Sequence, residues 1–516
     1  MARFMTAEEA VALVKDNDTL VTEGFILNTF PEILARALKD RYLKTGSPKN
    51  LTLIYAAGSG GGVNTGPDHF AQEGLLRRVI AGHWNLSPTL GKFAVENKIE
   101  AYNLPQGTIA QLYRDTAAGK VGTVTHVGLG TFVDPRLDGG KLNSVTTEDI
   151  VEVVTLGGRE QLLYKAHPMN VCFLRGTYSD EKGNISMEKE ALTLGGVSIA
   201  QAVKRNGGTV IVQVGGVVKN GTLNAKQVKI PSIYVDVVVA VPFAEHMAEV
   251  PPQMIEAHAG NKPIPTGSLA PMPMDERKII GRRGALDLKP NVTVNLGIGL
   301  PEAIASVANE EGIGDFISLT VEAGPVGGVP CGGLIFGASV NPECILDQAY
   351  QFDFYDGGGL DLAYLGLAEC DEKGNINVSK MGPRVTGCGG FINITQNAKR
   401  VFFCGTFTAK GLKVKAANGR LSIEQEGSVK KFLKNVNHIT FSGEYAVKTG
   451  QPVLYLTERA VFELKKDGLH LIEVAPGIDI EKNILPHMEF KPVISGTPKP
   501  MDPRIFTDAI MGLAQK

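Results

Sequence analysis

The 516-residue chain is predicted to fold as an α/β protein with mostly parallel sheets flanked by helices. Short apolar runs end in glycine and are followed by helical patterns, and this alternation returns in the second half of the chain. The 61 glycines sit in short clusters beside apolar runs, which is typical of tight strand-to-helix turns. A chain of this length exceeds one hydrophobic core, so two domains, or three, are expected.

The first strand is predicted over residues 18–24, where an apolar run is closed by Gly24. A helix follows over residues 31–38, with proline in its first turn and apolar side chains on one face. Residues 51–58 predict a second strand, and a glycine-rich loop at residues 59–62 follows it. This alternation of strand, loop and helix predicts a parallel sheet.

The same pattern recurs about 270 residues later. Residues 293–297, followed by Pro301, repeat the first strand and the start of the first helix at offsets of 274 and 270. Residues 317–324 repeat residues 51–58 at an offset of 266. Two similar halves are the simplest explanation.

A hexapeptide, Asp-Glu-Lys-Gly-Asn-Ile, occurs at residues 180–185 and again at residues 371–376, an offset of 191. We expect a hairpin turn at both places, with Gly183 and Gly374 supplying the positive φ angle. Because the offset falls from 266 to 191, the first half carries 75 extra residues between residues 58 and 180.

The stretch from Pro251 to Pro273 contains six prolines and little hydrophobic periodicity, which is typical of a linker. We therefore place a domain boundary near residue 275. The predicted domains are residues 1–275, which include the insertion, and residues 276–516.

Composition excludes several function classes. The net charge is −2, from 52 basic and 54 acidic residues, and no block of like charge indicates a nucleic-acid partner. The six cysteines form no Cys-x-x-Cys pair and have no histidine at ligand spacing, which argues against zinc or an iron–sulfur cluster. No apolar signal core and no run of about 18 apolar residues occurs, so we expect a cytoplasmic protein without membrane association.

One carboxylate is singled out by its position. Residues 317–330 begin as a β-rich apolar run, place Glu322 where that run ends, and continue into Gly and Pro. Ligands of parallel α/β sheets bind at this edge, although a turn glutamate in water would give the same pattern. The repeat aligns Ala56 with Glu322, which favours one active half supported by a half that shapes the substrate site.

A lone glutamate can act as a general base, a metal ligand or a nucleophile. A metal lacks further ligands, because the adjacent loop holds no His or second Asp. A nucleophile would need an activated acyl donor and backbone N–H groups for the oxyanion, which Gly324, Gly327 and Gly328 could supply. Leu296–Leu300 contains a Gly-x-Gly before a predicted helix, where phosphate could bind; such short motifs are mostly ordinary turns.

Longer motifs run through the whole chain. They are Glu23–Phe25 with Pro31 and Glu32, Val127–Arg136, Asn295–Pro301, Glu322–Pro330, Tyr355–Leu362, Gly387–Phe391, Thr457–Phe462 and Ala475–Asp479. With these motifs the sequence resembles the family I coenzyme A transferases, and within them most closely the propionate or acetate CoA-transferases. Some relatives are heterodimers whose subunits correspond to the two halves, in agreement with the repeat.

The resemblance implies the CoA-transferase fold and reversible transfer of CoA between a short-chain acyl-CoA and a carboxylate such as propionate, acetate, butyrate or lactate. Glu322 matches the nucleophile, which passes through an acyl-glutamyl anhydride to a γ-glutamyl-CoA thioester in ping-pong catalysis. Coenzyme A is then a substrate, no metal or redox cofactor is required, and a homotetramer or homodimer is expected. The implied CoA-binding residues are Gly297, Ile298, Gly299, Gly389 and Gly390, and the implied acyl-pocket or oxyanion residues are Gly24, Phe25, Ala56, Ala57, Gly58, Gly327 and Gly328.

The sequence departs from the keto-acid branch of this family. That branch has Ser-Glu-Asn-Gly around its nucleophile, whereas this chain has Val321–Gly324, and it has a polar Asn where Ala57 aligns. A simple short-chain acid is therefore favoured over a 3-oxoacid. Three alternatives remain: an acyl-CoA hydrolase on the same scaffold, a non-enzymatic acyl-CoA-binding paralogue, and a sugar-phosphate isomerase on a related fold.

Other conspicuous residues have simpler interpretations. Cys331 is expected to be a small apolar loop residue, and His83 and Trp84 are expected to serve packing. Arg282 and Arg283 are expected to be solvated at the exit of the linker and not to bind a CoA phosphate.

Overall fold

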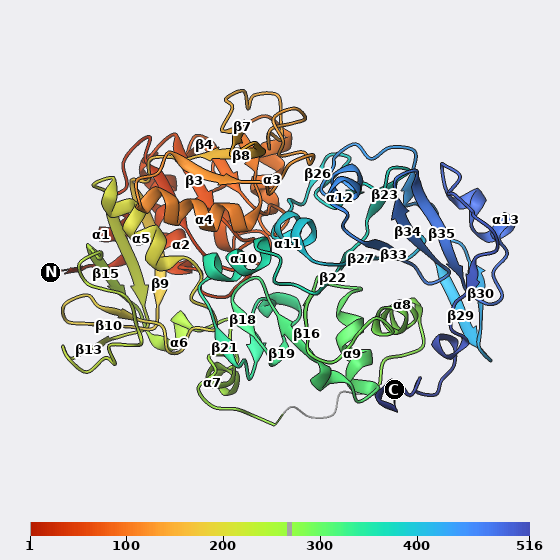
Figure 1. Cartoon of the computed structure of the whole chain (residues 1–516). Coiled ribbons are helices and arrows are strands. Elements are labelled where there is room, and N and C mark those ends of the chain that lie inside the picture. The colour runs from red at the N-terminus through yellow and green to blue at the C-terminus, as the bar shows by residue number, and fades with distance from the viewer. Residues whose placement is uncertain (1, 266–270, 516) are drawn as a thin grey trace. The chain divides into compact units, whose positions relative to one another are not determined.

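A computed structural model describes residues 2–265 and 271–515 of the chain (Figure 1). Its α/β architecture, with large parallel sheets flanked by helices, confirms the predicted fold class. The chain divides into two compact units, and each unit consists of three separate stretches of the sequence. The first unit comprises residues 1–265, 321–353 and 380–393, and the second comprises residues 266–320, 354–379 and 394–516.

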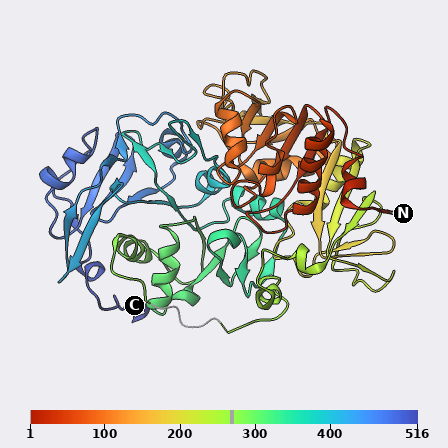
Figure 2. The same cartoon turned by 180° about the vertical axis from the view of Figure 1, so that it is seen from behind.

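An eight-stranded parallel sheet forms the centre of the first unit, in the order β1-β15-β12-β9-β2-β3-β4-β5 (Figure 2 shows it from behind). The predicted first and second strands are confirmed as β2 and β3. The strands are β1 (Arg3–Phe4), β2 (Thr19–Thr22), β3 (Leu51–Tyr55), β4 (Leu76–Ala81), β5 (Glu100–Asn103), β9 (Val171–Gly176), β12 (Thr209–Val214) and β15 (Val237–Ala240).

Helices cover both faces of this sheet. The predicted helix at residues 31–38 is confirmed as α2, which continues to Thr45. The helices are α1 (Ala7–Val11), α2 (Glu32–Thr45), the 3-10 helix η1 (Gly66–Phe70), α3 (Pro88–Val95), α4 (Gln106–Ala117), α5 (Gly196–Arg205) and α6 (Phe243–His246).

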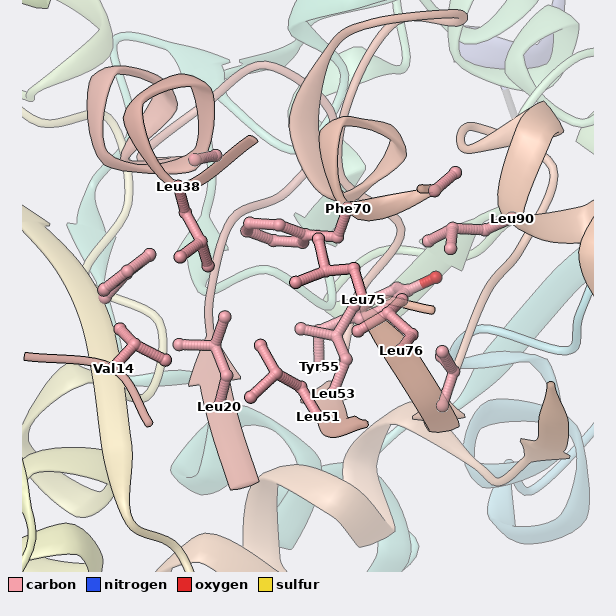
Figure 3. Packing of buried hydrophobic residues seen from close by; sticks show 14 of the residues in the cluster. Val14, Leu20, Leu38, Leu51, Leu53, Tyr55, Phe70, Leu75, Leu76 and Leu90 are labelled. Atoms are coloured by element: carbon pink, nitrogen blue, oxygen red, sulfur yellow. The ribbon is translucent and has the colours of Figure 1, made fainter. Parts of the chain in front are cut away.

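One hydrophobic core packs α1, α2, η1 and α3 against one face of the sheet (Figure 3). Along β3 the side chains of Leu51, Leu53 and Tyr55 enter this core, as the alternation of a strand requires. Leu38 from α2 and Phe70 from η1 meet them there. On the sheet, α5 contacts β9 and β12, and α4 packs on α5.

The extra residues of the first half add strands to this unit. Between residues 58 and 180 lie β4, β5 and a three-stranded antiparallel sheet of β6 (Gly122–Thr125), β8 (Arg159–Lys165) and β7 (Val151–Leu156). The remaining short strands of the unit are β10 (Tyr178–Asp180), β11 (Ile185–Ser186), β13 (Val217–Val218), β14 (Val228–Ile230), β18 (Pro325–Val326), β19 (Val329–Pro330), β20 (Ser339–Val340), β21 (Cys344–Ile345), β25 (Lys380–Met381) and β26 (Arg384–Val385).

The second unit repeats the central topology of the first. Its parallel strands β17-β16-β22-β27-β33 correspond, in sheet order, to β3-β2-β9-β12-β15. This matching order supports the predicted duplication. The strands are β16 (Val292–Leu296), β17 (Ile317–Thr320), β22 (Leu362–Gly366), β27 (Val401–Cys404) and β33 (Val453–Leu456), extended by antiparallel β34 (Ala460–Lys465) and β35 (Gly468–Val474) and by the parallel edge strand β36 (Lys499–Pro500).

The helices α8 (Glu276–Ala285) and α9 (Glu302–Glu310) pack their apolar side chains on this second sheet, in a core that includes Ile279, Ile304 and Phe402. The expectation that Arg282 and Arg283 are solvated is wrong. Arg282 donates to the main-chain carbonyls of residues 504, 505, 507 and 509. Arg283 pairs with Glu473 and Asp287. Both side chains are buried because the C-terminal segment supplies acceptors for them, which local sequence does not reveal.

Both hexapeptides form the predicted hairpins. Antiparallel β10 and β11 flank the first, where Gly183 has a φ of 96°. Antiparallel β23 (Glu369–Asp371) and β24 (Ile376–Asn377) flank the second, where Gly374 has a φ of 77°. In each turn the aspartate at the start accepts backbone N–H groups from the residues that follow.

The predicted linker at residues 251–273 is partly structured. It contains the 3-10 helix η2 (Pro252–Met254) and α7 (Ile255–His258), and Ile264 exchanges two hydrogen bonds with the side chain of Asn341. Residues 266–270 lie outside the described residues. The division into domains at residue 275 stays a prediction, since the compact units interleave in sequence.

Removing a core side chain should measure how strongly the first unit depends on its core. We expect Leu53→Ala to lower the free energy of unfolding by about 2–5 kcal/mol, because Leu53 is fully buried and the cavity cannot refill. Leu43→Ala on α2 is the control, since Leu43 is 62% exposed and its loss should cost less than about 0.5 kcal/mol. Denaturant titration followed by circular dichroism measures both, and equal losses would contradict the assigned core.

Candidate active site

Glu322 lies in a tight turn just beyond β17. The strand ends at Thr320, as the sequence predicts, and Glu322 follows two residues later. The N–H of Val321 donates to the carbonyl oxygen of Pro325 at 2.9 Å, and the N–H of Gly324 donates to the carbonyl oxygen of Val321 at 3.0 Å. These two bonds enclose Glu322 and fix its main chain, while its side chain is half-buried.

Only glycine fits at the position that closes this turn. Gly324 has a φ of 132°, and a Cβ there would lie 2.2 Å from the carbonyl oxygen of Leu346. The N–H of Leu346 in turn donates to the carbonyl oxygen of Gly324 at 3.0 Å. The Gly324 N–H is used inside the turn, so it is already engaged when a substrate oxyanion forms.

The residues directly before and after Glu322 in sequence belong to an apolar cluster, here called the turn cluster. Val321 and Ala323 are buried in it, and the predicted acyl-pocket residues Phe25 and Ala57 belong to it as well. The turn therefore packs on the loops that follow β2 and β3 of the first unit. The cluster comprises Phe25, Ile26, Ala57, Ala191, Leu192, Leu194, Val321, Ala323, Cys331, Phe336 and Ala338.

The predicted acyl-pocket residues of the first half come together at this edge of the sheet. The N–H of Ile26 donates to the carbonyl oxygen of Gly58 at 2.7 Å, which joins the loop after β2 to the loop after β3. A Cβ at Gly24 would lie 2.8 Å from Phe30, and one at Gly58 would lie 2.6 Å from the imidazole of His83. Both loops are thus packed as closely as glycine allows.

The segment that follows Glu322 packs on the loop after β2. The rings of Phe25 and Phe336 lie 5.8 Å apart, and a Cβ at Gly337 would lie 2.4 Å from the Phe25 ring. Ala56, the repeat partner of Glu322, is buried directly after β3. Gly327 and Gly328 form the turn between β18 and β19, with φ angles of 73° and 69°, and pack against residues 340–343.

The predicted CoA-binding residues divide between the two units. Gly297, Ile298 and Gly299 lie in the second unit, between β16 and α9. Ile298 is 59% exposed, and a Cβ at Gly299 would meet no atom within 4 Å, so the main chain before the helix is accessible. The N-terminus of α9, nine residues long, is the kind of position that favours a phosphate group.

Gly389 and Gly390 lie in the first unit, just before α11 (Phe391–Asn397). The N–H of Gly389 donates to the carbonyl oxygen of Gly82 at 2.7 Å, and its carbonyl oxygen accepts from the N–H of Gln106 at 2.9 Å. Gly389 therefore satisfies its own main-chain groups within the protein. Any contact it makes with CoA uses the surface beside these bonds.

Nδ1 of His83 and Nε2 of Gln106 are buried and have no hydrogen-bond partner among the described residues. Both side chains lie close to Gly389. Burial lowers the pKa of His83 to about 4, so the ring is neutral at physiological pH. His83 is expected from the sequence to serve packing, and no sequence pattern singles out Gln106. Their shared signal is that each follows the end of a parallel strand, β4 or β5.

Trp84 fills the core of the first unit, as expected. Cys331 belongs to the turn cluster, in agreement with its expected packing role, and its sulfur lies 3.6 Å from Nε2 of His258. Burial raises the pKa of the Cys331 thiol to about 11, which keeps it protonated and a poor nucleophile near neutral pH.

In the part of the chain that the structure describes, no group of three or more His, Cys, Asp or Glu residues is arranged to hold a metal ion. No helix there has the length and apolar character to cross a membrane.

A family model described as coenzyme A transferase matches residues 4–241. The acetate CoA-transferase YdiF of Escherichia coli O157:H7 is 45% identical over 511 residues, which cover 98% of this chain and 96% of the relative. The chain belongs to the family I coenzyme A transferases. It is therefore an enzyme that transfers CoA between acyl-CoA and carboxylates.

Further relatives of this CoA-transferase support the same family assignment. The caffeate CoA-transferase of Acetobacterium woodii is 44% identical over 519 residues, which cover 99% of each chain. The crystal structure of YdiF apoenzyme from Escherichia coli O157:H7 matches with a TM-score of 0.94 at 43% identity, over 99% of this chain and 97% of that chain. A second YdiF structure, described as a thioester complex with CoA, matches with a TM-score of 0.91 over the same shares of the two chains.

The turn at Glu322 should be sensitive to its closing glycine. We expect Gly324→Ala to lower kcat by 10-fold or more while the protein stays folded, because the new methyl group collides with the Leu346 carbonyl and displaces the turn. Gly332→Ala is the matched control in the same segment, since Gly332 has a negative φ and open space around it. Steady-state CoA transfer measures both, and a fully active Gly324→Ala enzyme would contradict the requirement for this turn.

Proposed function

We propose that this CoA-transferase moves CoA between short-chain acyl-CoAs and short-chain carboxylates, with Glu322 as the nucleophile. The observation that carries the proposal is the fixed turn at Glu322, whose neighbours Val321 and Ala323 pack against the loops after β2 and β3. In the duplicated sheet, the residue that corresponds to Glu322 is Ala56, which cannot react. Only one of the two sheet edges therefore offers a carboxylate at this position.

The first half-reaction uses two covalent steps. A carboxylate oxygen of Glu322 attacks the thioester carbonyl carbon, the C–S bond breaks, and an acyl-glutamyl anhydride and CoA thiolate form. The thiolate then attacks the glutamyl carbonyl of the anhydride and releases the free acid, leaving a γ-glutamyl-CoA thioester. An incoming carboxylate reverses both steps and leaves with CoA.

Exchange between similar acyl-CoAs is close to energetically neutral, so catalysis depends on positioning and on stabilising each oxyanion. Water must be excluded, because hydrolysis would waste the thioester. The turn cluster supplies an apolar lining for this purpose through Phe25, Ala57 and Phe336. Gly24, Ala56 and Gly58 continue this wall, and backbone N–H groups near Gly327 and Gly328 are proposed oxyanion donors.

The YdiF structure described as a thioester complex with CoA supports a covalent CoA intermediate in this enzyme. We propose that CoA lies along Gly297, Ile298 and Gly299 at the N-terminus of α9, and along Gly389 and Gly390. We also propose a homotetramer or homodimer located in the cytoplasm.

The activities named for the relatives bear on which carboxylic acid this enzyme accepts. One is an acetate CoA-transferase and another a caffeate CoA-transferase, so small and aromatic acids are both handled on closely related chains. We propose acetate, propionate, butyrate or lactate here, because the turn cluster, which holds the neighbours of Glu322, also contains two aromatic rings, and because Ala57 replaces a polar residue. A panel of these acids and caffeate, each offered with acetyl-CoA, separates the two classes by kcat/KM.

Trapping should place the covalent intermediate on Glu322. Incubation with acyl-CoA and no acceptor, followed by borohydride reduction and peptide mapping, is expected to modify Glu322 alone. Glu322→Gln should lose at least about 10³-fold in kcat, as expected when a nucleophile is removed. Cys331→Ala is the control and should keep both activity and labelling, and modification at Cys331 would overturn the assignment.

Hydrolysis is the second candidate, since water could intercept the same intermediate. Addition of acetate to enzyme and propionyl-CoA distinguishes the two reactions. Transfer predicts that acetyl-CoA accumulates, whereas release of free CoA without acetyl-CoA would support a hydrolase. A non-enzymatic acyl-CoA-binding protein would show neither product, and undiminished turnover by Glu322→Ala would refute the proposed mechanism.

A further inference from the structure

A second glutamate, Glu23, occupies an unusual position directly after β2. Its side chain is buried, with 6% of its surface exposed. Oε2 accepts a hydrogen bond at 2.9 Å from the N–H of Gly195. Gly195 is the N-cap residue of α5. Oε1 has no hydrogen-bond partner within residues 2–265 and 271–515, and a Cβ at Gly196 would lie 2.8 Å from it. The carboxyl group is thus enclosed against the start of a ten-residue helix.

The groups around Glu23 give it little compensation for burial. Burial raises the pKa of Glu23 to about 8; the Gly195 N–H opposes this rise, and Asp347 and Glu190 add to it. From the other elements, Tyr113 on α4 and Cys172 on β9 face the same carboxyl. No cation pairs with Glu23 among the described residues, in contrast to Glu190.

Glu190 shows what a compensated buried carboxylate looks like in the same unit. Burial opposes its ionisation, but Arg175 and His246 outweigh burial and lower the pKa of Glu190 to about 2. The chain therefore supplies partners for a buried structural charge elsewhere. Glu23 is left able to gain or lose a proton near neutral pH.

The segment held by Glu23 leads directly to the Glu322 turn. Leu194, next to Gly195, has a φ of 47°, which is strained for leucine and needs outside support. Its carbonyl oxygen accepts the N–H of Gln348 at 3.0 Å, at the start of α10 (Gln348–Asp356). One turn further on, Nε2 of Gln351 donates to the carbonyl oxygen of Val321 at 3.2 Å.

Apolar packing follows the same route. Leu192 and Leu194 belong to the turn cluster together with Val321 and Ala323. Asp347, whose charge faces Glu23, immediately precedes Gln348. A negative charge on Glu23 would therefore repel the start of α10 at the point where Leu194 holds it.

We propose that Glu23 is a positioning residue for Glu322, which it orients through Gly195, Leu194, α10 and the main chain of Val321, and that the neutral carboxyl gives the productive geometry. The inference rests on the proposed role of Glu322 as nucleophile. Glu23 touches no reacting atom in this account. It sets the position of the turn and makes that position depend on pH.

Two variants separate position from charge. Glu23→Ala removes the acceptor for Gly195, and we expect kcat to fall 10-fold or more with KM for acyl-CoA changed less than 3-fold. Glu23→Gln keeps an acceptor oxygen without a charge, and we expect it to recover most of the lost kcat. The wild-type kcat should decline above about pH 8 as Glu23 ionises, and Glu23→Gln should lack this decline.

Stability gives the independent readout. Between pH 4.5, the ordinary carboxyl pKa, and about pH 8, Glu23 keeps its proton in the folded protein and loses it in the unfolded chain. The free energy of unfolding therefore falls as the pH rises through this range, and the loss is complete above it. The Tm of the wild type should therefore fall more steeply from pH 6 to pH 9 than that of Glu23→Gln. If Glu23→Ala does not fold, the two pH profiles of Glu23→Gln still decide.

Leu34→Ala, a buried α2 substitution away from this route, is the control for general destabilisation. The rate of thioester formation at Glu322 is measured for all variants. Equal rates in Glu23→Ala and Leu34→Ala, or an unchanged alkaline decline in Glu23→Gln, would overturn the proposal. Absence of a thioester at Glu322 in the wild type would instead refute the proposed function, which keeps the two failures distinct.

Discussion

The closed turn between Val321 and Pro325 is the constraint on which the proposed chemistry depends. Two main-chain hydrogen bonds hold its ends, and Gly324 approaches the Leu346 carbonyl more closely than any other residue could. Burial of Val321 and Ala323 then fixes the turn against the loops after β2 and β3. The main chain that carries the proposed nucleophile therefore has little conformational freedom left to lose when the substrate binds.

The duplicated topology explains why one such turn suffices. The five central strands of each sheet have the same order, so both sheets present similar edges. At one edge the equivalent residue is Ala56, and this edge lies in the unit to which the Glu322 segment contributes. In the proposed mechanism, duplication followed by divergence leaves the reaction to one copy and the shaping of the substrate site to the other.

Much of the fold was predictable because its signals are local. Apolar runs closed by glycine predicted β2, β3, β16 and β17, and the repeated hexapeptide predicted two hairpins. The position of Glu322 after a strand was predictable for the same reason. The burial of Arg282 and Arg283 was not, because their acceptors other than Asp287 come from residues about 190 to 230 positions away. The environment of Glu23 depends likewise on Gly195 and Asp347, which no pattern near Glu23 reveals.

Oxygen exchange tests the central claim, that Glu322 carries CoA, most directly. In the proposed mechanism, acetate labelled with oxygen-18 attacks the glutamyl thioester, and the bridging oxygen stays on Glu322 when acetyl-CoA departs. Mass spectrometry of the peptide that contains Glu322, after turnover with acetyl-CoA and labelled acetate in unlabelled water, should therefore show heavy oxygen in that side chain. An unlabelled Glu322 after many turnovers, or label in another peptide, would contradict the account.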